Sequence, residues 1–223
     1  MQKDAESTIT QSWTTNADVW TRAVRSGAID SRERVTNAAI VDAVLTCQPG
    51  RVLDLGCGEG WLVRTLVANG VQASGADASQ GLIEAARASG GGEFHLCSYQ
   101  DLVQEPGQVG GPFDVIVANF SLLQEDLGAL LRSISTLLTA GGQLVIQTVH
   151  PAGVDHPAQE GWREEDFRNF DGQWQPMPWY YRPRDRWQHL LQESGYRVDL
   201  VREPTHPDSG NPLSLVFITT LTS

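Results

Sequence analysis

Glycines and a carboxylate that follow two neighbouring hydrophobic segments are the residues of this sequence best suited to hold a ligand. Residues Val52–Gly60, which read VLDLGCGEG, run from a strand pattern into a glycine-rich turn that opens a helix pattern. Glycines let the backbone approach a ligand closely, and amide groups point outward at a helix N-terminus. The next strand pattern ends at Asp77, about twenty residues on, where a carboxylate can accept hydrogen bonds from both hydroxyls of a ribose. These positions predict a nucleoside-containing ligand.

The spacing of the glycines separates two cofactors that such an arrangement binds, a dinucleotide and S-adenosylmethionine. A dinucleotide fingerprint is G-x-G-x-x-G, whereas this chain has G-x-G-x-G and places Trp61 where the third glycine would be. Asp54, on the strand just before the turn, would repel a pyrophosphate but suits a ligand that carries an ammonium and a sulfonium group. The balance favours S-adenosylmethionine, with S-adenosylhomocysteine as its product.

The stretch Arg51–Val149 resembles the class I S-adenosylmethionine-dependent methyltransferases, and the strands that follow are compatible with this family. The resemblance implies an α/β fold: a Rossmann-like, doubly wound, seven-stranded and mostly parallel sheet, with an antiparallel last strand and helices on both faces. Four segments carry the resemblance: Leu53–Gly60 is similar to the first motif of the family, Gly75–Ser79 to the second, Phe113–Phe120 to the fourth, and Ala140–Ile146 to the glycine turn and strand that follow.

The resemblance implies cofactor contacts around the glycine turn. The backbone of Gly56, Cys57 and Gly58 would touch the methionine part of the cofactor, and Cys57 would otherwise be a small filler of the turn without a catalytic role. Asp54 would help to hold the ammonium group, and Asp77 would bind the ribose. As alternatives, Asp54 could only cap the turn, and Asp77 could be an ordinary acid at a helix N-terminus.

Further contacts are implied at the ends of the neighbouring strands. Ala78, beside the ribose-binding acid, is expected to contact the cofactor, and Asn119 and Phe120 would lie beside the transferable methyl group. Many relatives carry an acidic residue that contacts adenine after the third strand. This chain has Ser98 and Tyr99 there instead, which could meet adenine by backbone and ring contacts.

Two residues after the fifth strand are candidates for the acceptor side. Methyl transfer from a sulfonium is an in-line displacement with a good leaving group, so no obligatory catalytic residue follows. His150 immediately follows the strand and could be a general base, since imidazole side chains exchange protons near neutral pH, or could cap the strand end. Tyr181 lies in a Tyr-Tyr-Arg segment that resembles one lining the acceptor site in some small-molecule members of the family. It could instead only pack a lid.

The N-terminal segment offers two further candidates. Trp20 and Arg25 could close over the methionine end of the cofactor, with Arg25 pairing its carboxylate, or could be a packing residue and a solvated charge. The acidic and histidine side chains of the Pro- and Gly-rich loop after residue 150 have no fixed spacing, and we predict no metal site.

The hydrophobic periodicity supplies the elements that position these residues. Short apolar runs alternate with helical stripes, as in a parallel sheet covered on both faces. The expected strands are 51–55, 71–76, 94–97, 113–118, 144–146, a strand through 196–200, and 213–221. The expected helices are 61–68, one capped by Ser79, one through Leu127–Leu138 that Ala140-Gly141-Gly142 ends, one from Asp30 to Leu45, one near 187–193, and a shorter one that holds Trp13 and Trp20.

Two segments that lie outside this alternation of strands and helices are expected to cover the site. We interpret residues 1–223 as a single methyltransferase domain, with 1–50 as an N-terminal helical cap and 150–185 as an aromatic insertion that forms a lid. The insertion is rich in Pro and Gly, yet it contains seven Trp, Tyr and Phe residues that are expected to pack over something.

Composition narrows the function. The 223 residues carry a net charge of −11, which disfavours a nucleic-acid substrate, and no stretch is long and apolar enough for a membrane span. The three cysteines, Cys47, Cys57 and Cys97, form no disulfide or metal pattern, and with no secretory signal they indicate a cytoplasmic protein. The oligomeric state, monomer or homodimer, stays open.

These observations favour an enzyme that transfers a methyl group to oxygen, nitrogen or carbon of a small-molecule acceptor. Two alternatives remain at this point: a non-catalytic module that binds S-adenosylmethionine or S-adenosylhomocysteine, and an NAD-dependent oxidoreductase.

Overall fold

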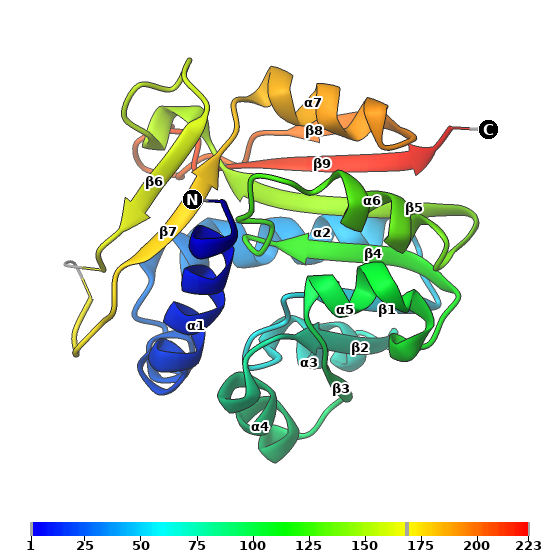
Figure 1. Cartoon of the computed structure of the whole chain (residues 1–223), viewed down its shortest axis with the longest axis horizontal. Coiled ribbons are helices and arrows are strands. Elements are labelled where there is room, and N and C mark those ends of the chain that lie inside the picture. The colour runs from blue at the N-terminus through cyan, green and yellow to red at the C-terminus, as the bar shows by residue number, and fades with distance from the viewer. Residues whose placement is uncertain (1, 168–169, 223) are drawn as a thin grey trace.

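Hydrophobic runs with little polar alternation form the central sheet. The computed structural model describes residues 2–167 and 170–222. Seven strands lie in the order β3-β2-β1-β4-β5-β9-β8, and β9 runs antiparallel to both of its neighbours whereas the pairs from β3 to β5 are parallel (Figure 1). This topology confirms the predicted fold class. The strands are β1 (Arg51–Leu55), β2 (Gln72–Asp77), β3 (Glu93–Leu96), β4 (Phe113–Asn119), β5 (Leu138–Val149), β8 (Tyr196–Arg202) and β9 (Ser214–Leu221).

Two apolar clusters, one on each face of the sheet, hold the helices in place. Successive side chains of a strand point to opposite faces. Leu53 and Leu55 of β1 therefore join the cluster under α5, α6 and α7, and Val52 joins the one under α2, α3 and α4. These helices are α2 (Asn37–Thr46), α3 (Trp61–Ala68), α4 (Gln80–Ser89), α5 (Tyr99–Gln104), α6 (Gly128–Ser135) and α7 (Arg184–Glu193).

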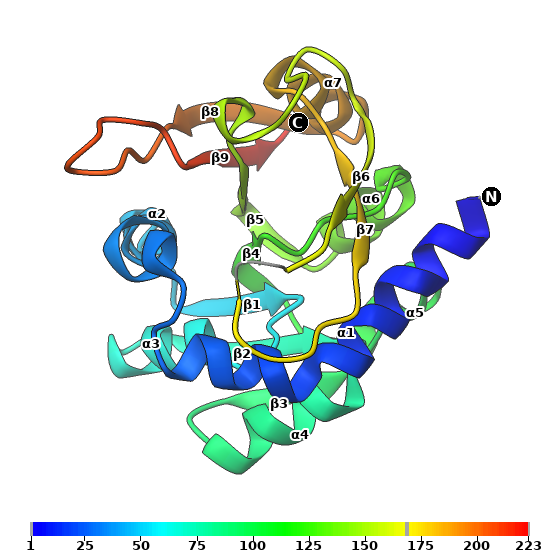
Figure 2. The same ribbon diagram turned by 90° about the vertical axis from the view of Figure 1, so that its left-hand side faces the viewer.

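The N-terminal segment and the aromatic insertion lie beside each other outside the sheet (Figure 2). The helix that holds Trp13 and Trp20 is α1 (Gln2–Arg25), which packs on α4 and on the insertion. With 24 residues it is longer than α2, so the expected shorter helix was wrong in length. The insertion contains an antiparallel pair, β6 (Gly161–Glu165) and β7 (Met177–Tyr181), which the sequence did not predict.

A buried amide joins α1 to the insertion. Asn16 is 1% exposed, and its Nδ2 donates to the carbonyl of Gln175 at 2.8 Å while its Oδ1 accepts from the Gln175 amide at 2.8 Å. Ser12 Oγ donates to the same carbonyl at 3.3 Å. Because both backbone groups of Gln175 are satisfied by one side chain, the insertion is held against α1 at a defined position.

The helix expected through Leu127–Leu138 is wrong at its C-terminal end. α6 ends at Ser135, and β5 already begins at Leu138, which pairs with Phe113 of β4. The glycines expected to stop the helix lie inside β5, where a Cβ on Gly142 would be 3.1 Å from the Phe113 carbonyl. The pairing with β4 therefore overrides the helical spacing of the last two leucines.

Candidate functional site

A large cavity lies at the carboxyl ends of the parallel strands. Its volume is about 1040 Å³, which is at the upper end of the usual range for ligand pockets, roughly 300–1,000 Å³. It begins at the glycine turn that follows β1 and reaches as far as β5. Residues of α1 and of the insertion also contribute to its wall. We call the part beside the turn and β2 the donor half, lined by Arg32, Gly56, Gly58 and Asp77, and the part beside β5 and β7 the acceptor half, lined by Trp13, Gln147, Phe167, Phe170, Trp179 and Tyr180.

The glycine turn lines the donor half with bare backbone. Gly56 and Gly58 have φ values of +70° and +56°, which favour glycine. A Cβ on Gly56 would lie 2.4 Å from Ser121 Cβ, so no larger residue fits. The amides of Gly56 and Cys57 donate to the Ala76 carbonyl at 2.8 and 3.1 Å, which fixes the turn against the end of β2.

Asp77 is held at the end of β2 by backbone amides. Gly58 N donates to its Oδ2 at 2.9 Å, and Ser79 N donates to its Oδ1 at 2.8 Å. Burial raises the pKa of Asp77, while the amides of Ser79, Gly58 and Ala78 oppose that rise. Each carboxylate oxygen retains capacity for a further hydrogen bond, and the residue lines the cavity. The structure therefore places this carboxylate where two vicinal hydroxyls could donate to it.

Asp54 lies deeper than Asp77 and is not among the residues that line the cavity. It is 2% exposed, and its Oδ1 has no hydrogen-bond partner among the described residues. Burial, reinforced by the nearby Asp77 charge, raises the pKa of Asp54 to about 8, and Arg32 partly offsets this rise. A buried acid without a full set of partners is costly, which is typical of a position that serves a ligand.

Arg32 is a cavity residue that the sequence did not single out. It begins the π-helical turn η1 (Arg32–Thr36), and its guanidinium lies over the rings of Trp20 and Trp61, with centroids at 5.5 and 5.1 Å. Burial lowers its pKa to about 10, so it remains a cation. Nε donates to Asn37 Oδ1 at 3.3 Å, but the buried Nη2 finds no partner within the described chain. The donor half thus contains a cation with an unsatisfied donor.

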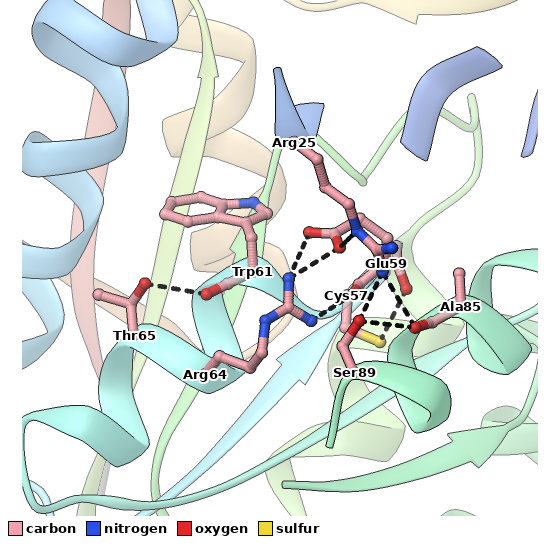
Figure 3. A network of polar contacts seen from close by, with 9 residues as sticks. Arg25, Cys57, Glu59, Trp61, Arg64, Thr65, Ala85 and Ser89 are labelled. Atoms are coloured by element: carbon pink, nitrogen blue, oxygen red, sulfur yellow. Dashed lines mark hydrogen bonds and ion pairs between the residues drawn. The ribbon is translucent and has the colours of Figure 1, made fainter. Parts of the chain in front are cut away.

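Arg25 lies outside the cavity lining, in contrast to the role predicted for it. Its Nε donates to Glu59 Oε2 at 2.9 Å, and its Nη2 donates to Ser89 Oγ and to the Ala85 carbonyl of α4 (Figure 3). Arg64 of α3 donates to the same buried Glu59. The expected pairing of Arg25 with a cofactor carboxylate is therefore replaced by a structural network that ties the end of α1 to the turn. Trp20, the other residue predicted to close over the methionine end of the cofactor, does line the cavity.

The end of β4 brings two further predicted residues to the cavity. Asn119 lines it, and its buried Oδ1 is unpartnered among the residues described. Phe120 also lines the cavity and has a φ of +52°, which is strained for a phenylalanine and is typical of functional positions. Its amide donates to the Gln147 carbonyl at 2.8 Å, which holds the strained turn against β5.

The positions expected to meet adenine line the cavity, but their hydroxyl groups are already engaged. Ser98 caps α5, a helix that the sequence did not predict, and forms a reciprocal capping box with Asp101. Tyr99 Oη donates to the Ser121 carbonyl at 3.2 Å. The backbone of both residues and the ring of Tyr99 remain for contacts with a ligand, and their contact with adenine stays a prediction. Ala78 and Cys57 line the same half, and burial raises the pKa of the Cys57 thiol well above its usual value.

The two residues predicted to act on the acceptor do not line the cavity. His150 Nδ1 accepts from Ala152 N at 3.0 Å, and its Nε2 lies 3.6 Å from Glu203 Oε2. This geometry matches the alternative in which the histidine caps the strand end. Tyr181 is 1% exposed, and its hydroxyl donates to the Pro157 carbonyl at 3.0 Å. Its neighbour Tyr180 lines the cavity instead.

Over residues 2–167 and 170–222, no group of three or more His, Cys, Asp or Glu side chains is arranged to hold a metal ion. In the same part of the chain, none of the helices has the length and apolarity that a membrane crossing requires.

The sheet order is that of a Rossmann-like fold, and the cavity lies beside its glycine turn. A family model described as a methyltransferase domain matches residues 30–201, which is well over half of the sequence. The chain belongs to this methyltransferase family. The predicted class, a class I S-adenosylmethionine-dependent methyltransferase, is confirmed, and the alternative of an NAD-dependent oxidoreductase is wrong.

Relatives agree with this assignment. An uncharacterized methyltransferase of Schizosaccharomyces pombe is 25% identical over 183 residues, which cover 75% of this chain and 67% of the yeast protein. The ubiquinone biosynthesis O-methyltransferase of Xanthomonas oryzae is 31% identical over 117 residues, 49% of this chain and 47% of that protein. This match spans about half of the length of the Xanthomonas enzyme.

A solved structure shows the same fold over the whole chain. The 1,6-didemethyltoxoflavin-N1-methyltransferase of Burkholderia thailandensis, crystallised with 1,6-didemethyltoxoflavin and S-adenosylhomocysteine, superposes with a TM-score of 0.71 and 17% identity, covering 100% of this chain and 91% of that one.

Proposed function

We propose that this protein transfers the methyl group of S-adenosylmethionine to an oxygen, nitrogen or carbon atom of a small molecule bound in the acceptor half of the cavity. The observation that carries the proposal is the carboxylate of Asp77, which two backbone amides fix at the edge of a cavity large enough for two ligands. The names of the Xanthomonas and Burkholderia relatives both refer to small molecules, which supports a small acceptor.

The polar groups of the donor half fit this cofactor. Asp77 would accept hydrogen bonds from the ribose hydroxyls. The unsatisfied oxygen of Asn119 would accept from the ammonium group, and that of Asp54, which lies behind the lining, would do so directly or through water. The free donor of Arg32 would pair with the carboxylate. Each of these three buried groups has an orphaned atom among the described residues, and a zwitterionic amino acid would satisfy acceptors and donor together.

In the reaction, the chain has to position the acceptor atom and to exclude water. S-adenosylmethionine supplies a methyl group on a good leaving group, so the protein needs to hold an acceptor atom in line with it. The strained Phe120, at the end of β4, lies between the two halves of the cavity, where the methyl group would pass from donor to acceptor. Asn16 holds the insertion against α1, so that both segments can cover the cavity from water. No group of the described lining is required as a base, and any proton of the acceptor would pass to water or to a polar lining group.

Calorimetry with S-adenosylmethionine and S-adenosylhomocysteine tests the cofactor site. Asp77→Ala should weaken binding of both by roughly 1.5–3 kcal/mol because a charge-assisted hydrogen bond is lost. The thermal unfolding of the variant must be followed in parallel, since Asp77 also accepts from the turn. An unchanged dissociation constant in a folded variant would refute the role of Asp77.

Turnover separates the enzyme from a non-catalytic binding module. Protein incubated with methyl-labelled cofactor and fractionated small metabolites should transfer label to a small-molecule fraction. Tight cofactor binding with no labelled product from any fraction would favour the binding module instead.

A further inference from the structure

The walls of the acceptor half are aromatic and are braced by other rings. Trp13 of α1 stands 4.9 Å from Trp20 in an edge-to-face arrangement. Phe167, which is 3% exposed, stacks on Trp174 at 4.6 Å. Braced aromatic rings offer a large, rigid contact surface to a flat apolar molecule. Trp179 and Tyr180 of β7 also line this half.

The charges of the acceptor half lie at its exposed rim. Its only acidic side chains among the described lining are Asp126 and Glu165, and both are exposed. Asp126 Oδ1 accepts from Gly128 N, and Glu165 Oε1 accepts from Phe167 N. Within the described lining the single cation is Arg32, which belongs to the donor half. An anionic acceptor would therefore find no cation in the described lining of this half, although Arg182 lies behind the Tyr180 ring, and the net charge of −11 would repel it.

One buried amide gives this half its polar specificity. Gln147 lines the cavity from β5 and is 1% exposed. Its Nε2 donates to Ser214 Oγ at 2.8 Å, whereas its Oε1 has no partner in the described part of the chain. A buried acceptor that is left unsatisfied is costly, and a ligand that donates a hydrogen bond to it removes that cost.

We propose that the methyl acceptor is a flat, uncharged aromatic or heteroaromatic molecule whose ring carries an O–H or N–H group, and that this group donates a hydrogen bond to Gln147 Oε1. The inference rests on the proposed function and names the substrate class of the same site. The aromatic walls favour a flat acceptor, and the absence of a cation in the described lining of this half favours an uncharged one. The free oxygen of Gln147 would orient the acceptor through its O–H or N–H group.

Three probes that share one ring system test each element of the proposal. Naphthol carries a hydroxyl donor, methoxynaphthalene lacks that donor, and naphthoate carries a negative charge. Each is titrated by calorimetry into protein saturated with S-adenosylhomocysteine. Naphthol should bind at least tenfold more tightly than either of the other two. Quinazolinone, a neutral ring with an N–H donor, should bind like naphthol.

A variant pair on β5 assigns the donor contact to one side chain. Gln147→Leu should remove the difference between naphthol and methoxynaphthalene while leaving the affinity for S-adenosylhomocysteine unchanged. Gln143→Leu, the same change on the same strand outside the cavity lining, should keep the difference. Comparing the two probes in the unmodified protein remains decisive if Gln147→Leu does not fold.

The outcomes separate this inference from the proposed function. Failure of S-adenosylmethionine and S-adenosylhomocysteine to bind would overturn the proposed function. If the cofactor binds, the inference alone is overturned when methoxynaphthalene or naphthoate binds as well as naphthol, when no neutral ring binds, or when the donor preference persists in folded Gln147→Leu.

Discussion

Replacing Asp54 with asparagine should stabilise the ligand-free protein and weaken cofactor binding. The pKa of Asp54 rises from 3.8 to about 8 on folding because the carboxyl is buried near Asp77. Between these two values the folded protein keeps a proton that the unfolded chain releases, so its stability falls as the pH rises. One pKa unit corresponds to about 1.36 kcal/mol, so about 3.2 units between pH 3.8 and pH 7 give a cost of up to about 4 kcal/mol at pH 7. Asp54→Asn avoids this cost.

Urea unfolding at several pH values measures this effect. The unmodified protein should lose up to about 1.4 kcal/mol per pH unit through this group between about pH 4 and pH 8, and Asp54→Asn should lack this component. The gain in the variant should vanish near pH 4. Asp18→Asn makes the same chemical change at an exposed position of α1 and should keep the slope of the unmodified protein. A variant that is less stable than the unmodified protein at pH 8, or that shows the same slope, would refute the reasoning.

Two other substitutions test the donor half and the attachment of the insertion to α1. Arg32→Leu should weaken S-adenosylmethionine binding by roughly 10- to 150-fold through loss of a charge-assisted hydrogen bond, and decarboxylated S-adenosylmethionine should bind both proteins equally in calorimetry. Arg34→Leu, at an exposed arginine of the same turn, is the control. If Arg32→Leu weakened binding of S-adenosylmethionine and of its decarboxylated form equally, the pairing of Arg32 with the carboxylate would be contradicted. Asn16→Leu should lower the free energy of unfolding by about 2–3 kcal/mol because the Gln175 backbone loses its partner, whereas the exposed Thr15→Leu should change it little. Equal stability of these two variants in urea would show that the insertion is held in another way.

Local patterns in the sequence were sufficient for the sheet and for the donor half. The strand that ends in the glycine turn, and the acid that ends the next strand, depend on backbone conformation and on residues close in the chain. Gly56, Gly58 and Asp77 therefore lie where they were predicted. Asn119 and Phe120 also line the cavity, as predicted, because parallel strands bring their carboxyl ends to one edge of the sheet.

Tertiary packing decided which of two similar neighbours faces the cavity. Arg25 and Arg32 both lie in the N-terminal segment, but α1 carries Arg25 to Glu59 while the π-helical turn brings Arg32 over two tryptophans. Tyr180 lines the cavity, whereas Tyr181 is 1% exposed and its hydroxyl donates to the Pro157 carbonyl.

The sequence by itself determined the fold class and the cofactor, because strand periodicity and a short glycine motif are encoded within a few residues of each other. The tertiary structure alone decided where β5 begins, that residues 161–181 contain a strand pair, and that Gln147 lies buried with one free acceptor among the described residues. The reason is physical. These features depend on contacts between segments that are distant in the chain, and no local pattern records which partner a strand or a side chain will meet.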